Sequence, residues 1–137
     1  MKESFFRFSD PHITSIQYKD NPDFDPESFE DMRIDFTNHI GRSKEQNKAQ
    51  VTVNMEIGDD KASPFQIRIA MRAYFEWDDC DNEELVQELL EKNAVSLLIG
   101  YIRPLVSMIT SSSRFPTFNL PFIDLTGSDS SESDANS

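Results

Sequence analysis

The sequence predicts an α+β fold in which a four-stranded antiparallel sheet carries a long C-terminal apolar helix on one face. Four segments before residue 78 alternate apolar and polar side chains, which is the period of strands with one wet face. After residue 81 the apolar residues recur instead at helical spacing. We therefore expect a single domain over residues 1–126, followed by a disordered, acidic, serine-rich tail at 127–137.

The two strands of the predicted hairpin have the clearest pattern. Apolar residues occupy the odd positions throughout 49–57 and 65–77, and mostly polar residues fall between them. The stretch GDDKAS between the two supplies turn residues, so we expect a hairpin. Another strand begins at Met32 and runs toward Ile40, and we expect it to be an antiparallel neighbour.

The N-terminal strand covers residues 13–18, and Phe6 and Phe8 extend it toward the start of the chain. Pro11 interrupts this strand, which predicts an edge position or a bulge. The connection to the next strand, DNPDFDPESFED, is too long for a tight hairpin and contains two prolines and four aspartates. Connections of this length are often functional.

The C-terminal helix is apolar on most of its circumference. Asp81 or Asn82 caps its start, and large apolar residues dominate after Asn93. One sheet face covers only one side of such a helix, and a chain of this size leaves no second layer for the other side. We therefore expect a second copy of the helix to cover it across a two-fold axis. The expected interface consists of Leu98, Tyr101, Ile102, Leu105, Val106 and Ile109.

Pro104 removes one backbone hydrogen bond inside this helix, which predicts a kink or a break. With Arg103, it also keeps the uninterrupted apolar run well under the roughly 20 residues that cross a bilayer. The N-terminus shows no apolar segment of a signal peptide, and Cys80 is the only cysteine. These features predict a cytoplasmic protein that does not insert into membranes.

Charge and motif content argue against several functions. Lys and Arg number 13 against 25 Asp and Glu, a net charge of -12, so nucleic acid would be repelled. His12, His39 and Cys80 show no metal-ligand spacing. No Gly-rich phosphate loop or nucleophile motif is present. We expect no metal, no cofactor and no catalytic residues, and thus a protein that is not an enzyme.

Several aromatic residues lie outside the predicted strands. Phe24 and Phe29 fall in the acidic connection, and Phe115, Phe118 and Phe122 follow the helix. Such rings either fill the protein's own core or line a groove that binds extended apolar peptide. The sequence leaves both interpretations open.

The order of these features resembles the bacterial export chaperone SecB. The resemblance rests on four strands, an acidic crossover loop after the first, the helix segment GYIRP, a Ser-rich turn and FPTFNLPFIDL. It covers residues 6–126 and is most specific over 93–125. It implies an ATP-independent holdase that binds unfolded polypeptides and keeps them competent for translocation, as a dimer or a dimer-of-dimers tetramer. It also implies client grooves whose lining residues here would be Phe24, Phe29, Phe75, Trp77, Phe118 and Phe122.

Two departures from the SecB pattern bear on the partners. Better-known members continue into a second helix and a tail that docks the SecA motor, whereas only a short Ser/Asp tail follows here. They also present acidic groups on the exposed sheet face, where this chain has Arg68 and Arg72. SecA is therefore a doubtful partner. A SecB-like chaperone dedicated to one client, such as the antitoxin of a toxin–antitoxin system, is the alternative.

Two other classes remain as alternatives. A small thioesterase-like α+β enzyme also lays a long apolar helix on an antiparallel sheet, but it places the helix early and a catalytic acid on or beside it. Here the helix follows the strands, and no acid lies between Ala94 and Ser113. A structural adaptor would bury all of its aromatic residues within its own oligomer.

Overall fold

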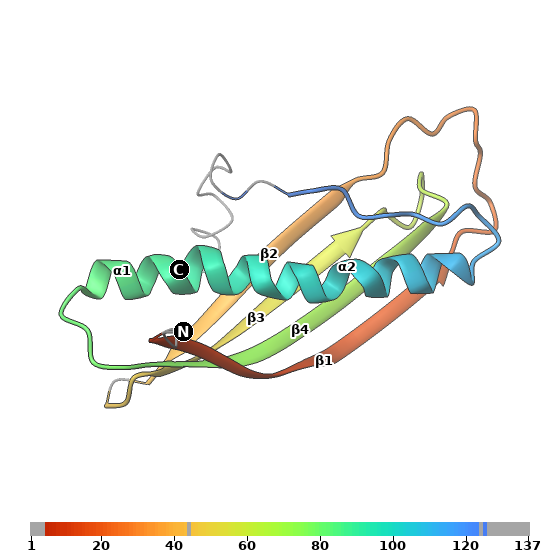
Figure 1. The fold of residues 1–137 in the computed structure, drawn as a ribbon. Coiled ribbons are helices and arrows are strands. Elements are labelled where there is room, and N and C mark those ends of the chain that lie inside the picture. The colour runs from red at the N-terminus through yellow and green to blue at the C-terminus, as the bar shows by residue number, and fades with distance from the viewer. Residues whose placement is uncertain (1–4, 44, 124, 126–137) are drawn as a thin grey trace.

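A computed structural model of the chain describes residues 5–43, 45–123 and 125. It contains four strands and a helical run (Figure 1). The strands are β1 (Phe6–Asp20), β2 (Ile34–Arg42), β3 (Lys48–Ile57) and β4 (Phe65–Trp77). The helical run comprises α1 (Glu83–Glu88), the π-helical segment η1 (Leu89–Ala94) and α2 (Val95–Ser111). The α+β prediction is confirmed, and the tail predicted at 127–137 lies outside the described residues.

The four strands form one antiparallel sheet in the order β1-β4-β3-β2. Since β1 and β2 lie at opposite edges, the chain crosses from one edge to the other between residues 20 and 34 (Figure 1). The long acidic connection seen in the sequence is this crossover loop. β3 and β4 form the predicted hairpin, and this hairpin lies at the centre of the sheet.

β1 is a single long edge strand. Its pairing with β4 shifts register between Ser9 and His12, where Asp10 has a positive φ of 56°. This irregularity lies beside Pro11, whose nitrogen cannot donate to the ladder. That proline predicted an edge position or a bulge, and β1 has both.

The core lies between the sheet and the helices. Val51, Val53 and Ile67 from the odd positions of β3 and β4 are fully buried, and Leu98 and Ile102 of α2 are equally buried. The two-residue alternation of the strands therefore gives the apolar face that the helix covers. Asn82 caps α1 as predicted, since its side chain accepts a hydrogen bond from Leu85 N.

The helix is covered on two sides within one chain, which corrects the expectation that no second layer was left. Residues 115–123 turn back and run beside α2 (Figure 1). Thr110 Oγ1 accepts a hydrogen bond from Phe118 N at 2.9 Å, and Arg103 donates to the Leu120 carbonyl at 3.3 Å. Leu120 is 4% exposed and belongs to the core. Leu98, Ile102 and Val106 are fully buried within one chain and so inaccessible to a partner, contrary to their predicted place in an interface.

Pro104 does not break the helix, which continues through it to Ser111. Because Pro104 has no backbone N–H, the carbonyl of Gly100 loses its helical hydrogen bond. Both residues are exposed, so water can bond to that carbonyl. The run from Glu83 to Ser111 spans 29 residues, enough by length and composition to cross a membrane. It packs on the sheet as the core helix of a soluble protein does, so this is weak evidence for a membrane span.

Candidate functional site

Four aromatic rings meet where the crossover loop leaves β1, and we call them the loop cluster. Phe24 packs edge-to-face on Phe29 at 5.4 Å between ring centroids, and on Phe115 at 5.5 Å. Phe115 in turn contacts Phe65 at 6.2 Å. Phe65 is 1% exposed, whereas the other three rings are half-buried. The loop cluster is therefore a continuous aromatic path from the core to the surface.

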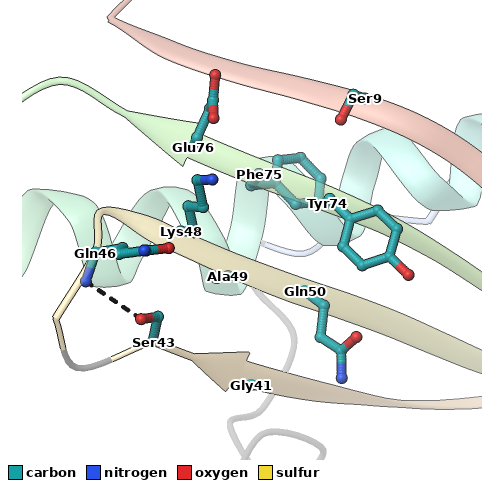
Figure 2. A pocket seen from close by; sticks show the side chains of 10 residues that line it. All are labelled: Ser9, Gly41, Ser43, Gln46, Lys48, Ala49, Gln50, Tyr74, Phe75 and Glu76. Atoms are coloured by element: carbon teal, nitrogen blue, oxygen red, sulfur yellow. Dashed lines mark hydrogen bonds between the residues drawn. The ribbon is translucent and has the colours of Figure 1, made fainter.

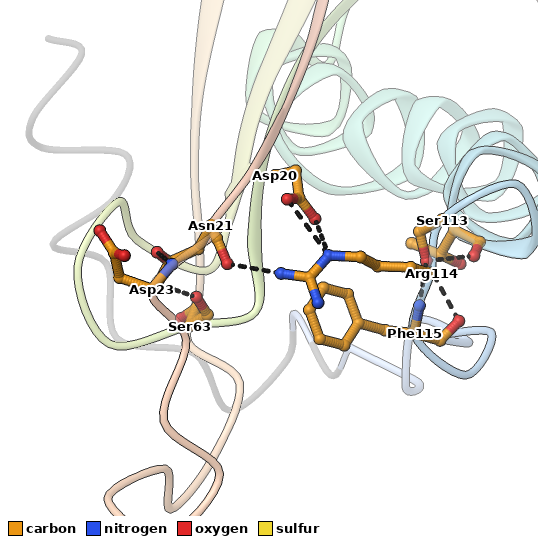
Figure 3. Close-up of polar contacts among 8 residues, drawn as sticks. Asp20, Asn21, Asp23, Ser63, Ser113, Arg114 and Phe115 are labelled. Carbon is orange, nitrogen blue, oxygen red and sulfur yellow. Dashed lines mark hydrogen bonds and ion pairs between the residues drawn. The ribbon is translucent and has the colours of Figure 1, made fainter.

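Arg114 fixes the end of α2 to the start of the crossover loop (Figure 3). Its Nε lies 3.1 Å from Asp20 Oδ1, and its Nη2 donates to the Asn21 carbonyl at 2.9 Å. The guanidinium also lies over the Phe115 ring, 4.4 Å from the centroid. Beside this contact, burial raises the pKa of Tyr18, and a hydrogen bond to Ser113 offsets part of that rise. The Tyr18 phenol is therefore neutral at physiological pH and carries no charge at this junction.

Asn21 anchors the loop to the β3–β4 turn. The residue is 8% exposed, and its Nδ2 donates to the Lys61 carbonyl at 3.0 Å and to the Ser63 carbonyl at 2.9 Å. Its Oδ1 accepts from Asp23 N at 3.0 Å, and its backbone N donates to Pro64 O. The buried amide is thus fully used as an anchor. The sequence carried no signal for this role.

Asp59 stabilises the same turn, and its contribution to folding stability should depend on pH. Its carboxylate accepts from the backbone N–H groups of Ala62, Lys61 and Ser63, and these bonds lower its pKa. Since its folded pKa is depressed, the stabilisation is present above the unfolded pKa and is lost as pH falls through the folded value. Asp59→Asn should therefore lower stability most at pH 7. The difference from wild type in urea unfolding should shrink below about pH 4, and a gap that stays constant with pH would contradict this.

The predicted client-binding residues do not lie at one site. Phe24 and Phe29 belong to the loop cluster. Phe118 is half-buried beside α2, while Phe122 is 87% exposed.

Phe75 and Trp77 belong to the core and lie away from the loop cluster, near the end of β4. They are 3% and 5% exposed and stack on Phe6, with centroids at 5.6 and 6.1 Å. Both occupy odd positions of β4, the side that faces the helix. Their placement argues against direct contact with a client, and this part of the prediction is corrected.

A second surface, which we call the β1–α2 face, carries exposed apolar side chains. On β1, Phe8, Ile13 and Ile16 are 44%, 41% and 46% exposed, and on α2 Tyr101 and Met108 are 42% and 64% exposed. Phe8 and Tyr101 touch edge-to-face at 6.4 Å, so strand and helix residues form one surface. These strand residues pair with buried positions of β4 and lie on the helix side of the sheet. Of the predicted interface, only Tyr101 is well exposed, while Leu105 and Ile109 are half-buried.

The other face of the sheet has a polar character. A hollow of about 430 Å³ there is lined by side chains that include Lys48, Gln50, Tyr74 and Glu76 (Figure 2). The Glu76 carboxylate lies 3.7 Å from Arg7, so it is engaged in an ion pair. Among the described residues, no group of three or more His, Cys, Asp or Glu could hold a metal ion. The hollow has the composition of an ordinary wet sheet face.

Comparison with known proteins gives a likeness in structure alone. No protein-family model and no curated protein matches the sequence. The solved structure of Mycobacterium tuberculosis Rv1957, a SecB-like chaperone in complex with a ChAD peptide from the HigA1 antitoxin, is similar with a TM-score of 0.72. The match covers 87% of this chain and 91% of that chain at 14% identity. A Streptococcus agalactiae protein of unknown function has a TM-score of 0.49 at 12% identity, over 85% of this chain and 97% of that chain. The chain has a SecB-like fold.

Proposed function

We propose that this protein is an ATP-independent holdase that binds non-native polypeptides through apolar contacts. The observation that carries the proposal is the shared fold with a SecB-like chaperone solved with an antitoxin peptide. Because a fold alone does not fix a function, the argument also needs a suitable surface. The half-buried ring of Phe115 in the loop cluster and the exposed ring of Phe122 supply apolar contact area of the kind that such binding needs.

Two kinds of client fit this proposal. An export chaperone would hold many precursors, whereas a dedicated chaperone would hold one partner such as an antitoxin. Arg68 pairs with Glu56 and Arg72 donates to Thr52 Oγ1 on the outer sheet face, so the acidic surface associated with SecA docking is absent from these positions. Mass spectrometry of what co-purifies with the protein from its own cells separates the two roles.

The proposed assembly is a homodimer or a dimer-of-dimers tetramer in the cytoplasm. Its contact surface would be the β1–α2 face, where an edge strand with exposed apolar side chains lies beside exposed residues of α2. Exposed apolar patches and unpaired strand edges are commonly covered by a partner. This proposal keeps Tyr101 and replaces the buried helix residues with Phe8, Ile13, Ile16 and Met108.

An aggregation assay tests the proposed function. The purified protein should suppress light scattering by a chemically denatured client without nucleotide. Phe122→Ser should weaken the effect, because loss of about 1 kcal/mol of apolar contact requires roughly fivefold more protein. The fold should be unaffected, since Phe122 is 87% exposed.

Tyr74→Ser is the matched control, because Tyr74 is an exposed aromatic residue of the opposite sheet face. It should suppress aggregation as well as wild type does. No suppression by wild type at one tetramer per client chain would count decisively against a holdase.

A further inference from the structure

The crossover loop is held firmly at its two ends. At its start, Asn21 makes hydrogen bonds to the β3–β4 turn, and Arg114 binds both Asp20 and the Asn21 carbonyl. At its end, Gly58 N donates to the Arg33 carbonyl at 2.7 Å, immediately before β2 begins. Residues 22–31 therefore form a flap between two fixed points.

Between these ends the flap bonds to itself and to its anchor Asn21. Phe24 N donates to Asn21 O and Ser28 N to Asp25 O, each at 3.2 Å, and Phe29 N donates to Pro26 O at 3.4 Å. Within the part of the chain that the structure describes, no hydrogen bond joins residues 22–31 to the core of the sheet or to α2. The flap can thus lift by turning about Asn21 without leaving a buried backbone group unpaired.

Charge does not hold the flap down. It contains Asp23, Asp25, Glu27, Glu30 and Asp31 and no Lys or Arg. None of these carboxylates forms an ion pair with another described residue. Since the whole chain carries a net charge of -12, electrostatic repulsion favours a lifted flap.

The ring contact of the flap with the rest of the molecule is that of Phe24 on Phe115, at 5.5 Å and an interplanar angle of 86°. Phe29 packs on Phe24 from within the same flap. Beyond the apolar area that it buries, one such edge-to-face contact shifts a population by roughly two- to twelvefold. A lifted minority state of about a tenth or less is therefore reachable by thermal motion.

We propose that Phe24 is an internal occupant of the client site. In the described state its ring covers Phe115, and an aromatic or large aliphatic side chain of a bound polypeptide takes the same place when the flap lifts. The apparent affinity for a client is then reduced by the fraction of closed molecules. This inference rests on the proposed function and adds to it a competition between Phe24 and the client for the Phe115 ring. Phe115 is absent from the client-binding residues predicted from the sequence.

Paired substitutions test the proposal because its two partners should act in opposite directions. The probe is a fluorescein-labelled, unstructured peptide of about 15 residues with one Phe, followed by fluorescence anisotropy. Phe24→Ala should bind it up to about tenfold more tightly, since the competitor is removed. Phe115→Ala should bind it more weakly, since the acceptor ring is removed. A peptide with Ser in place of Phe should not distinguish Phe24→Ala from wild type.

Each outcome decides one question. If wild type and Phe24→Ala both fail to bind the peptide, the proposed function fails. If wild type binds but Phe24→Ala binds equally or less tightly, the holdase survives and the internal occupant is rejected. Should urea unfolding show that Phe115→Ala does not fold, Phe115→Leu replaces it. Unchanged affinity in Phe115→Leu for the Phe peptide then also rejects the proposal.

Discussion

Replacing Ile102 with alanine is expected to cost about 2–5 kcal/mol of unfolding free energy, the usual range for a large aliphatic residue truncated in a core. Ile102 is fully buried in the core that α2 forms with the sheet. Truncation leaves a cavity that neighbours packed from both sides cannot fill completely. The measurement is urea unfolding followed by far-UV circular dichroism at one fixed protein concentration, because assembly would otherwise shift the midpoint.

Leu85→Ala provides the control from an exposed apolar position of the same helical run, outside the β1–α2 face. Leu85 is 36% exposed, so its truncation should affect stability by much less than that of Ile102. Equal losses at the two positions would mean that the helix does not lie on the sheet by the face described here.

Introducing two aspartates at Ile13 and Ile16 should reduce the solution mass to that of one chain, 15.8 kDa. Both side chains are more than 40% exposed in a single chain and lie on the β1–α2 face. Burying two unpaired carboxylates against a partner would cost several kcal/mol, enough to prevent assembly at micromolar concentration. Light scattering coupled to size-exclusion chromatography measures the mass.

The control is Gln17→Asp on the same strand. Gln17 pairs with Arg68 in register and lies on the opposite sheet face, so this charge should leave the assembly intact. Two results would refute the proposed interface: a wild type that is itself a single chain at micromolar concentration, or a double variant that retains the wild-type mass.

Much of the fold could be predicted because its signals are local. The alternation over β3 and β4 defines both the strands and their buried face, and Pro11 marks the bulge of the edge strand. Helix capping by Asn82 was also visible, since its side chain acts on residues a few positions away. Of the kink or break predicted at Pro104, the break does not occur: the helix continues to Ser111, and the exposed carbonyl of Gly100 can be satisfied by water.

The candidate site could be predicted only in part. Phe24 and Phe29 were singled out because large rings are unusual in an acidic loop, and both lie in the loop cluster. Phe75 and Trp77 were placed in the groove by resemblance, although their odd positions on β4 put them in the core. Phe115 was noticed as an aromatic residue after the helix, but its contact with Phe24 joins segments about 90 residues apart.

The sequence by itself determined the order of strands, crossover loop and helix, because periodicity and capping depend on neighbouring residues. The tertiary structure alone decided what covers each apolar face. The segment after α2 turns back beside the helix and bonds to Arg103 and Thr110, while Leu98, Ile102 and Val106 are fully buried and Tyr101 and Met108 stay exposed. A periodic pattern shows that a face must be covered, but contacts between distant segments determine whether the cover is the same chain or another molecule.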